Sequence, residues 1–124
     1  MDRTREFLQL TEKLLIYVET MEKTFKAVKK TGKGRDFFSE VKPFADKVKQ
    51  VNDKWKEGGQ VWIETKNPKN IHKQQIESVH EQIEATSVQA FFPETSLTRF
   101  KNTIASITYV LEKVILTMKE EKRE

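Results

Sequence analysis

Apolar residues recur along most of this chain at alternating spacings of three and four positions, which is the repeat of helices packed in a bundle. Four such stretches are present, and turn-forming residues separate them. The pattern predicts helices at about 3–30, 36–66, 70–92 and 96–121. The residues expected to face the core are, helix by helix, Phe7, Thr11, Leu14, Val18, Met21, Phe25 and Val28; Val41, Phe44, Val48, Val51, Trp55, Gly58 and Trp62; His72, Ile76, Val79, Ile83, Thr86 and Ala90; and Leu97, Phe100, Ile104, Ile107, Leu111, Val114 and Met118.

Glycines, prolines and capping residues set the predicted helix ends. Gly32 and Gly34 favour a turn after the first helix. Pro68 stops the second helix at Lys66, because the residue before a proline avoids helical backbone angles. The expected N-caps of the second, third and fourth helices are Asp36 or Ser39, Asn70, and Thr95 or Ser96.

The short predicted connections define the fold class. Helices joined by about four to five residues run antiparallel to their chain neighbours. The sequence therefore predicts an all-α, antiparallel, up-down-up-down four-helix bundle, and the three-four spacing predicts left-handed coiling. We expect residues 1–124 to form a single domain that folds without a cofactor.

Polar or missing side chains interrupt the core stripe at Thr11, Gly58, His72 and Thr86. Folding the first helix onto the second about residue 33 brings Thr11 beside Trp55, and the same operation about residue 67 brings His72 beside Trp62. The residues that this arrangement gathers at one end of the bundle, and that form a candidate ligand-binding cleft, are Thr11, Trp55, Gly58, Trp62 and His72.

Ordinary packing is the alternative explanation of the same residues. Gly58 lets a bulky neighbour such as Phe7 approach the second helix closely. His72 is more readily explained as a partly buried histidine near a helix cap, bonded to a backbone carbonyl, than as a ligand or a base. We favour packing over a pocket.

The charge distribution gives little support to nucleic-acid binding. The chain has 23 Lys and Arg against 19 Asp and Glu, a net charge of +4. The densest basic stretch comprises Lys26, Lys29, Lys30, Lys33 and Arg35. No aromatic residue interleaves with it to stack on bases, and lysines at a helix end are also favoured by the helix dipole. Weak nucleic-acid association through this hairpin is therefore the third hypothesis.

Other classes of protein are excluded by what the chain lacks. It has no cysteine, which removes disulfides, thiolate metal sites and cysteine nucleophiles. The longest apolar run, 14–18, is too short to cross a membrane, so we expect a cytoplasmic protein without a membrane partner.

Metal and catalytic motifs are incomplete. Glu77 and His80 match one Glu-x-x-His motif, but a di-iron bundle needs two such motifs and two further inward glutamates. Glu77 points outward in the predicted helix, where it can pair with Lys73. With two histidines in the chain and no inward carboxylate pair, we expect no metal, no cofactor and no enzyme.

Three large apolar residues fall on the outer faces of the predicted helices. They are Ile16 on the first helix and Tyr109 and Leu116 on the fourth. Antiparallel folding puts Ile16 and Tyr109 at similar heights, so these side chains are the candidate interaction surface.

Three segments resemble a known family. They are 55–58 (WKEG), 68–77 (PKNIHKQQIE) and 99–101 (RFK). In these segments the chain is similar to the YppE-like family, small uncharacterised proteins of Bacillus-type bacteria. The resemblance implies a four-helix bundle and transfers no activity. It singles out Trp55, Glu57, Gly58, Pro68 and His72 as a cluster to test, because the matched residues coincide with the candidate cleft at Trp55, Gly58 and His72.

The leading functional hypothesis is a non-enzymatic bundle that acts through contacts with an unidentified protein partner, as a monomer or a weak dimer. The alternative is a small-molecule binder that uses the end cleft around Trp55, Trp62 and His72.

Overall fold

The computed structural model describes residues 3–123, which form helices joined by short turns and contain no strand. The elements are α1 (Arg3–Thr31), a π-helical turn η1 (Phe37–Val41), α2 (Lys42–Lys66), α3 (Lys73–Gln89) and α4 (Leu97–Arg123). The predicted all-α four-helix bundle is confirmed.

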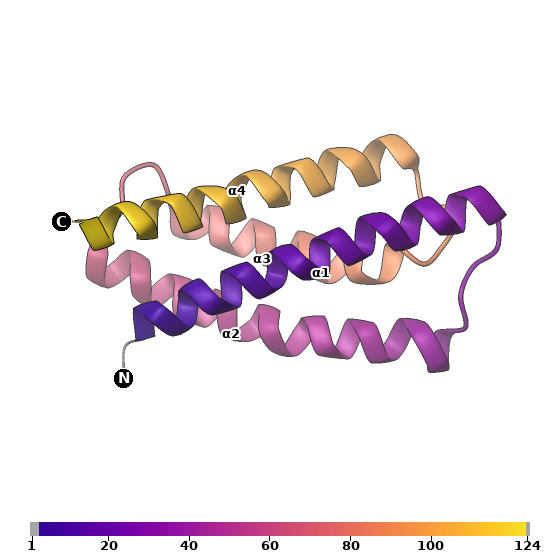
Figure 1. Cartoon of the computed structure of the whole chain (residues 1–124), viewed down its shortest axis with the longest axis horizontal. Coiled ribbons are helices and arrows are strands. Elements are labelled where there is room, and N and C mark those ends of the chain that lie inside the picture. The colour runs from indigo at the N-terminus through magenta and orange to yellow at the C-terminus, as the bar shows by residue number, and fades with distance from the viewer. Residues whose placement is uncertain (1–2, 124) are drawn as a thin grey trace.

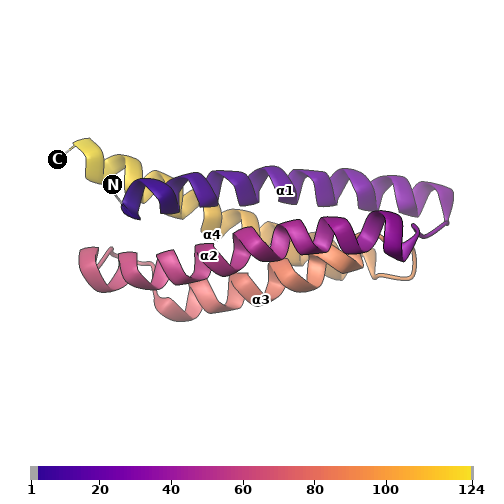
Figure 2. The same ribbon diagram turned by 90° about the horizontal axis from the view of Figure 1, so that it is seen from below.

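The helices run antiparallel to their chain neighbours around one core. Thr11 bonds to Trp55 across α1 and α2, Asn52 bonds to His80 across α2 and α3, and Phe25 stacks on Phe100 across α1 and α4. The start of α1 and the end of α4 lie at the same end of the bundle (Figures 1 and 2). The left-handed coiling stays a prediction.

The buried residues closely follow the core positions predicted from the spacing. All seven core positions expected in α1 are buried, as are six of the seven expected in α4. Leu97 is the exception in α4 and is 46% exposed. Phe44 and Gly58 are half-buried, whereas Gly59, Asn52 and Ile71, which the stripe did not include, are buried.

The segment before α2 departs from a regular helix. Asp36 caps it as expected, with Oδ2 accepting hydrogen bonds from the Ser39 N–H and hydroxyl, each at 2.8 Å. The Val41 N–H donates to the Asp36 carbonyl at 3.2 Å, which is the wider i to i+5 pattern of a π-turn. Pro43 follows in the first turn of α2, where its missing N–H is tolerated.

The third helix is shorter than predicted at both ends. Asn70 is not its N-cap, because its backbone has the left-handed φ of 65°. The chain reverses there, buries Ile71 in the core and begins α3 after His72, which is the N-cap. At the other end, Ala90 is the C-cap, and the predicted last residues 91–92 belong to the turn.

The fourth helix begins as expected after Ser96, whose carbonyl accepts from the Phe100 N–H at 2.9 Å. The Ser96 hydroxyl accepts from the Arg99 N–H at 3.3 Å. No helix within residues 3–123 is both long enough and apolar enough to span a membrane.

Candidate functional site

Trp55 and Thr11 meet in the core as the folding argument predicted. The Trp55 indole Nε1 donates to the Thr11 hydroxyl at 2.9 Å, and that hydroxyl donates to the Phe7 carbonyl at 2.8 Å. Both side chains are fully buried. This chain of bonds satisfies the polar atoms of two core residues and therefore explains why a threonine lies on the apolar stripe.

Phe7 fills the space between the two tryptophans. Its ring centroid lies 6.0 Å from that of Trp55 and 5.4 Å from that of Trp62. A Cβ added at Gly58 would lie 3.2 Å from Phe7 Cδ1. The packing explanation of Gly58 therefore describes what the structure shows between these helices.

His72 does not lie on the core face, which corrects the expected position. It is exposed, and the inward place beside α2 is taken by Ile71. The His72 N–H donates to the Gln75 side-chain oxygen at 2.8 Å, as a residue at a helix start does. Trp62, its expected neighbour, instead donates from Nε1 to Glu121 at 3.1 Å. A ligand-binding role for the five predicted residues stays a prediction.

A groove that shares only Gly58 with the predicted cleft lies between the start of α1 and the second half of α2. Phe7 and Gly58 lie along it, and charged residues of both signs surround them. The full lining is Arg3, Glu6, Phe7, Leu10, Lys54, Glu57, Gly58 and Val61.

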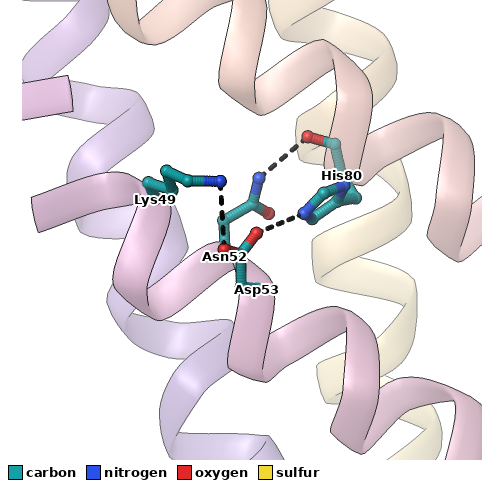
Figure 3. Close-up of polar contacts among 4 residues, drawn as sticks. All are labelled: Lys49, Asn52, Asp53 and His80. Atoms are coloured by element: carbon teal, nitrogen blue, oxygen red, sulfur yellow. Dashed lines mark hydrogen bonds and ion pairs between the residues drawn. The ribbon is translucent and has the colours of Figure 1, made fainter. Parts of the chain in front are cut away.

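A polar network that the sequence analysis did not identify joins α2 to α3 (Figure 3). His80 Nε2 lies 2.7 Å from Asp53 Oδ1, and Lys49 Nζ lies 3.2 Å from Asp53 Oδ2. Beneath this pair, the Asn52 amide donates to the His80 carbonyl at 2.8 Å. Asn52 is 1% exposed, and its Oδ1 has no hydrogen-bond partner in the described part of the chain.

The network stabilises the charged forms of Asp53 and Lys49. The hydrogen bond with His80 is the largest cause that lowers the pKa of Asp53 below its ordinary value, and Lys49 adds to it. The hydrogen bond to Asp53 in turn raises the pKa of Lys49. Elsewhere, the bonds from Ser39 lower the pKa of the capping carboxylate of Asp36.

Sequence spacing carried a partial signal for this network. Asn52 is four residues after Val48 and three before Trp55, so it borders the core stripe of α2. Asp53 and His80 are 27 positions apart, and their contact depends on the register between α2 and α3. Lys73 pairs with Glu64 of α2 at 2.5 Å, and not with Glu77 as expected.

The predicted interaction residues are all exposed: Ile16 by 61%, Tyr109 by 62% and Leu116 by 60%. The ring centroids of Phe25 and Phe100 lie 4.1 Å apart, so these two residues mark one height along the antiparallel helices α1 and α4. Ile16 precedes Phe25 by nine residues and Tyr109 follows Phe100 by nine, so Ile16 and Tyr109 also lie at the same height. Nine residues are two and a half turns at ~3.6 residues per turn, so both side chains point away from the core. That all three form one surface stays a prediction.

Two adjoining hollows, here together called the α1–α4 groove, lie between these two helices. Its first stretch is lined by Glu22, Phe25, Lys26, Lys29, Leu97, Phe100, Lys101 and Ile104. Its second stretch is lined by Glu22, Lys101, Ile104, Ala105, Thr108, Tyr109 and Glu112. The two stretches share three residues and include Tyr109 of the predicted interaction surface.

Two cations of the predicted basic hairpin are engaged within the chain. Lys29 Nζ donates to the Pro93 carbonyl at 2.7 Å, and Arg35 pairs with Glu40 at 3.3 Å. Nucleic-acid association through Lys26, Lys29, Lys30, Lys33 and Arg35 stays a prediction.

Phe37 and Phe38 form an exposed aromatic pair that the sequence analysis did not single out. Phe38 is 78% exposed, and the two rings meet edge to face at 5.2 Å. Phe37 and Phe38 precede the buried Val41 by four and three residues, so a regular helix would turn both rings toward the core. The wider η1 turn changes their direction.

Residues 3–121, whose side chains can be placed, contain no group of three or more His, Cys, Asp or Glu suited to hold a metal ion.

The sequence of the chain matches a family of bacterial domains. Residues 11–118 match the family described as "Bacterial domain of unknown function (DUF1798)", and the chain belongs to it. This confirms the resemblance to the YppE-like family.

Relatives with known sequence or structure support the assignment. The chain is 27% identical over 111 residues to the uncharacterised protein YppE of Bacillus subtilis (strain 168), which covers 90% of each chain. It is similar to the crystal structure of that protein with a TM-score of 0.93, 26% identity and full coverage of both chains. A Listeria innocua protein of unknown function has a TM-score of 0.92 at 25% identity, with 98% of each chain covered.

Proposed function

We propose that this chain is a non-enzymatic binding protein and that it contacts another protein along the α1–α4 side of the bundle. The observation that carries the proposal is the α1–α4 groove, with the exposed ring of Tyr109 at its edge. Leu116 lies two turns further along the same face of α4 and is equally exposed.

The chemistry of Tyr109 suits an interface. Tyrosine is among the residues that contribute most to binding energy at protein contacts, because it combines a large apolar ring with a polar tip. The Lys113 ammonium lies 5.5 Å from the Tyr109 ring centroid, which keeps one side of the ring beside a cation.

The Asp53–His80 pair is explained by its role in the fold, and this favours a binding role of the chain over a catalytic one. Asp53 contacts Lys49 within α2 and His80 of α3, and the contact with His80 joins the two helices. Both of its carboxylate oxygens are therefore used by the fold.

Affinity capture with matched variants tests the proposal. The bait is the wild-type chain or the Tyr109→Glu/Leu116→Glu double variant, exposed to lysate of the producing bacterium. We expect a protein that the wild type retains and the double variant loses. A Lys47→Glu variant on α2 is the control, and circular dichroism verifies that every bait is folded.

The capture experiment has one contradicting result and one useful extension. Equal recovery with the wild type and the double variant would contradict the proposal. An additional Ile16→Glu variant shows whether the surface extends around α1, as the sequence analysis predicts.

A small-molecule site remains the second candidate, supported by the outer groove at Gly58 and Phe7. Binding there would perturb the amide signals of Gly58 and Val61 in an NMR titration against a metabolite set. Unchanged signals across the set would count against it.

A further inference from the structure

We infer that the segment of the partner received by the α1–α4 groove is an amphipathic helix whose acidic end lies over Lys26, Lys29 and Lys101. This inference rests on the proposed function and adds the chemistry of the partner. It is drawn from the length, the apolar floor and the charges of the groove.

The groove has the dimensions of a helix-binding seam. On α4 it extends from Leu97 to Glu112, which is roughly 22 Å at ~1.5 Å per residue. A helix of about four turns fits along this length. Segments of this kind dock through apolar side chains at positions i, i+4 and i+7.

The floor of the first stretch is apolar. The floor is made of Phe25 and Phe100, whose ring centroids lie 4.1 Å apart, and of Ile104. Each of the three is at most 5% exposed, so they shape the groove and contribute little new apolar burial. Leu97 is half exposed at the end of the floor and offers apolar surface that a partner can cover. Burial of such surface is the main favourable term in association.

Lysines dominate the edges of this stretch. The Lys29 ammonium is fixed by its bond to the Pro93 carbonyl at 2.7 Å and lies 5.4 Å from the Phe25 ring centroid. Within residues 3–121 no ion pair involves Lys26 or Lys101. A helix laid over the floor removes these ammonium groups from water, which is costly unless carboxylates pair with them.

The second stretch reverses the charge and sets the polarity of the partner. Glu112 lines only this stretch, whereas Lys26 and Lys29 line only the first. Glu22 and Lys101 line both stretches, and Lys101 is the one cation of the second. The acidic residues of the docked helix therefore lie at the end over Lys26 and Lys29, and its other end is neutral or basic. A nucleic acid, with phosphates along its whole length, would meet both glutamates, so an acidic protein helix fits the groove better.

Fluorescence anisotropy with a synthetic peptide tests the inference. The probe is a fluorescein-labelled 15-residue peptide with leucines at i, i+4, i+7 and i+11 and glutamates flanking them in its first two turns. We expect it to bind, and we expect the Lys26→Glu/Lys101→Glu variant to bind it at least tenfold more weakly. The control variant, Lys47→Glu/Lys69→Glu, makes the same charge change elsewhere and should bind within twofold of the wild type.

Matched peptides and a milder variant complete the design. A permuted peptide of identical composition and a version with lysine for glutamate should both bind at least tenfold more weakly than the probe. Lys26→Gln/Lys101→Gln, which removes charge without reversing it, guards against misfolding of the first variant. Amide shifts of Ala105 and Lys26 in an NMR titration locate the bound peptide.

Several results would overturn the inference. They are equal binding of the permuted or lysine peptide, no effect of the charge reversal, or tighter binding of single-stranded DNA of equal charge. Sedimentation that shows a dimer of the free chain, lost in Lys26→Glu/Lys101→Glu, would make a second copy the occupant. Partner capture that needs Tyr109 and Leu116 but not Lys26 and Lys101 would leave the protein contact standing and reject the acidic helix.

Discussion

Trp55 is the largest side chain in the core that is fully buried, and its single polar atom is satisfied by one residue. The Thr11 hydroxyl accepts a hydrogen bond from the indole N–H and donates one to the Phe7 carbonyl. Phe7 in turn packs against both tryptophans and against Gly58 and Gly59. At the scale of single residues, the predicted end cluster is therefore a packed polar-aromatic unit centred on Phe7.

Replacement of Thr11 by valine tests the hydrogen bond directly. Thr11→Val keeps the shape but leaves the buried Trp55 N–H without an acceptor, which costs ~1–3 kcal/mol. Urea unfolding followed by tryptophan fluorescence measures the loss. Thr11→Ser, which retains the hydroxyl, should lose less, and equal stability of Thr11→Val and the wild type would contradict the role assigned to the bond.

The two adjacent glycines should respond differently to alanine. At Gly58 a new Cβ meets one edge of Phe7 at 3.2 Å, whereas at Gly59 it meets Ile76 at 3.1 Å and Phe7 at 3.2 Å. Alanine gains up to ~1 kcal/mol of helix propensity, and overpacking costs ~1–3 kcal/mol. We expect Gly58→Ala to be neutral or slightly stabilising and Gly59→Ala to destabilise by ~1 kcal/mol in thermal unfolding. The reverse order would contradict the packing described here.

At the scale of elements, periodicity predicted what lies within a helix better than what lies between helices. The stripes of α1 and α4 were predicted almost residue by residue, since burial there follows the helical repeat. Ile71 was missed because it lies in a loop, where the left-handed Asn70 ends the repeat and turns the chain inward. The Asp53–His80 pair was missed because it depends on the register of α2 against α3.

The contacts of Asp53 with His80 and Lys49 predict how the free energy of unfolding depends on pH. The folded-state pKa of Asp53 is lowered, so its contribution is present above the unfolded value of ~3.9 and is lost as pH falls through the folded pKa. The pKa of Lys49 is raised, so its contribution is present below ~10.4 and is lost as pH rises through the folded pKa.

Comparison of Asp53→Asn with the wild type measures this contribution. Exposed ion pairs of this kind contribute ~0.2–1 kcal/mol, and the difference in unfolding free energy should shrink between pH 5 and pH 2, a window set by the ~3.9 reference value. NMR titration of the Asp53 carboxyl carbon gives the pKa itself. A value at or above ~3.9 would contradict the network, and His80→Phe should move the pKa of Asp53 back toward that value.

At the scale of the whole molecule, the fold is shared with relatives whose function is unknown, so the surfaces decide what can be proposed. The sequence predicted the exposure of Ile16, Tyr109 and Leu116, because outward positions follow from the same helical repeat as the core. It could not predict the α1–α4 groove, because α1 ends at Thr31 and α4 begins 66 positions later, at Leu97. It also missed Phe37 and Phe38, which the π-turn redirects.

Photo-crosslinking in living cells tests the central claim, that the α1–α4 side of this bundle contacts another protein. A photoreactive phenylalanine analogue is placed at Tyr109 in the groove, at Lys47 on α2 or at Glu77 on α3, all of which are exposed. We expect a discrete protein adduct from position 109 and none from positions 47 and 77. Adducts from 47 or 77, with none from 109, would contradict that claim.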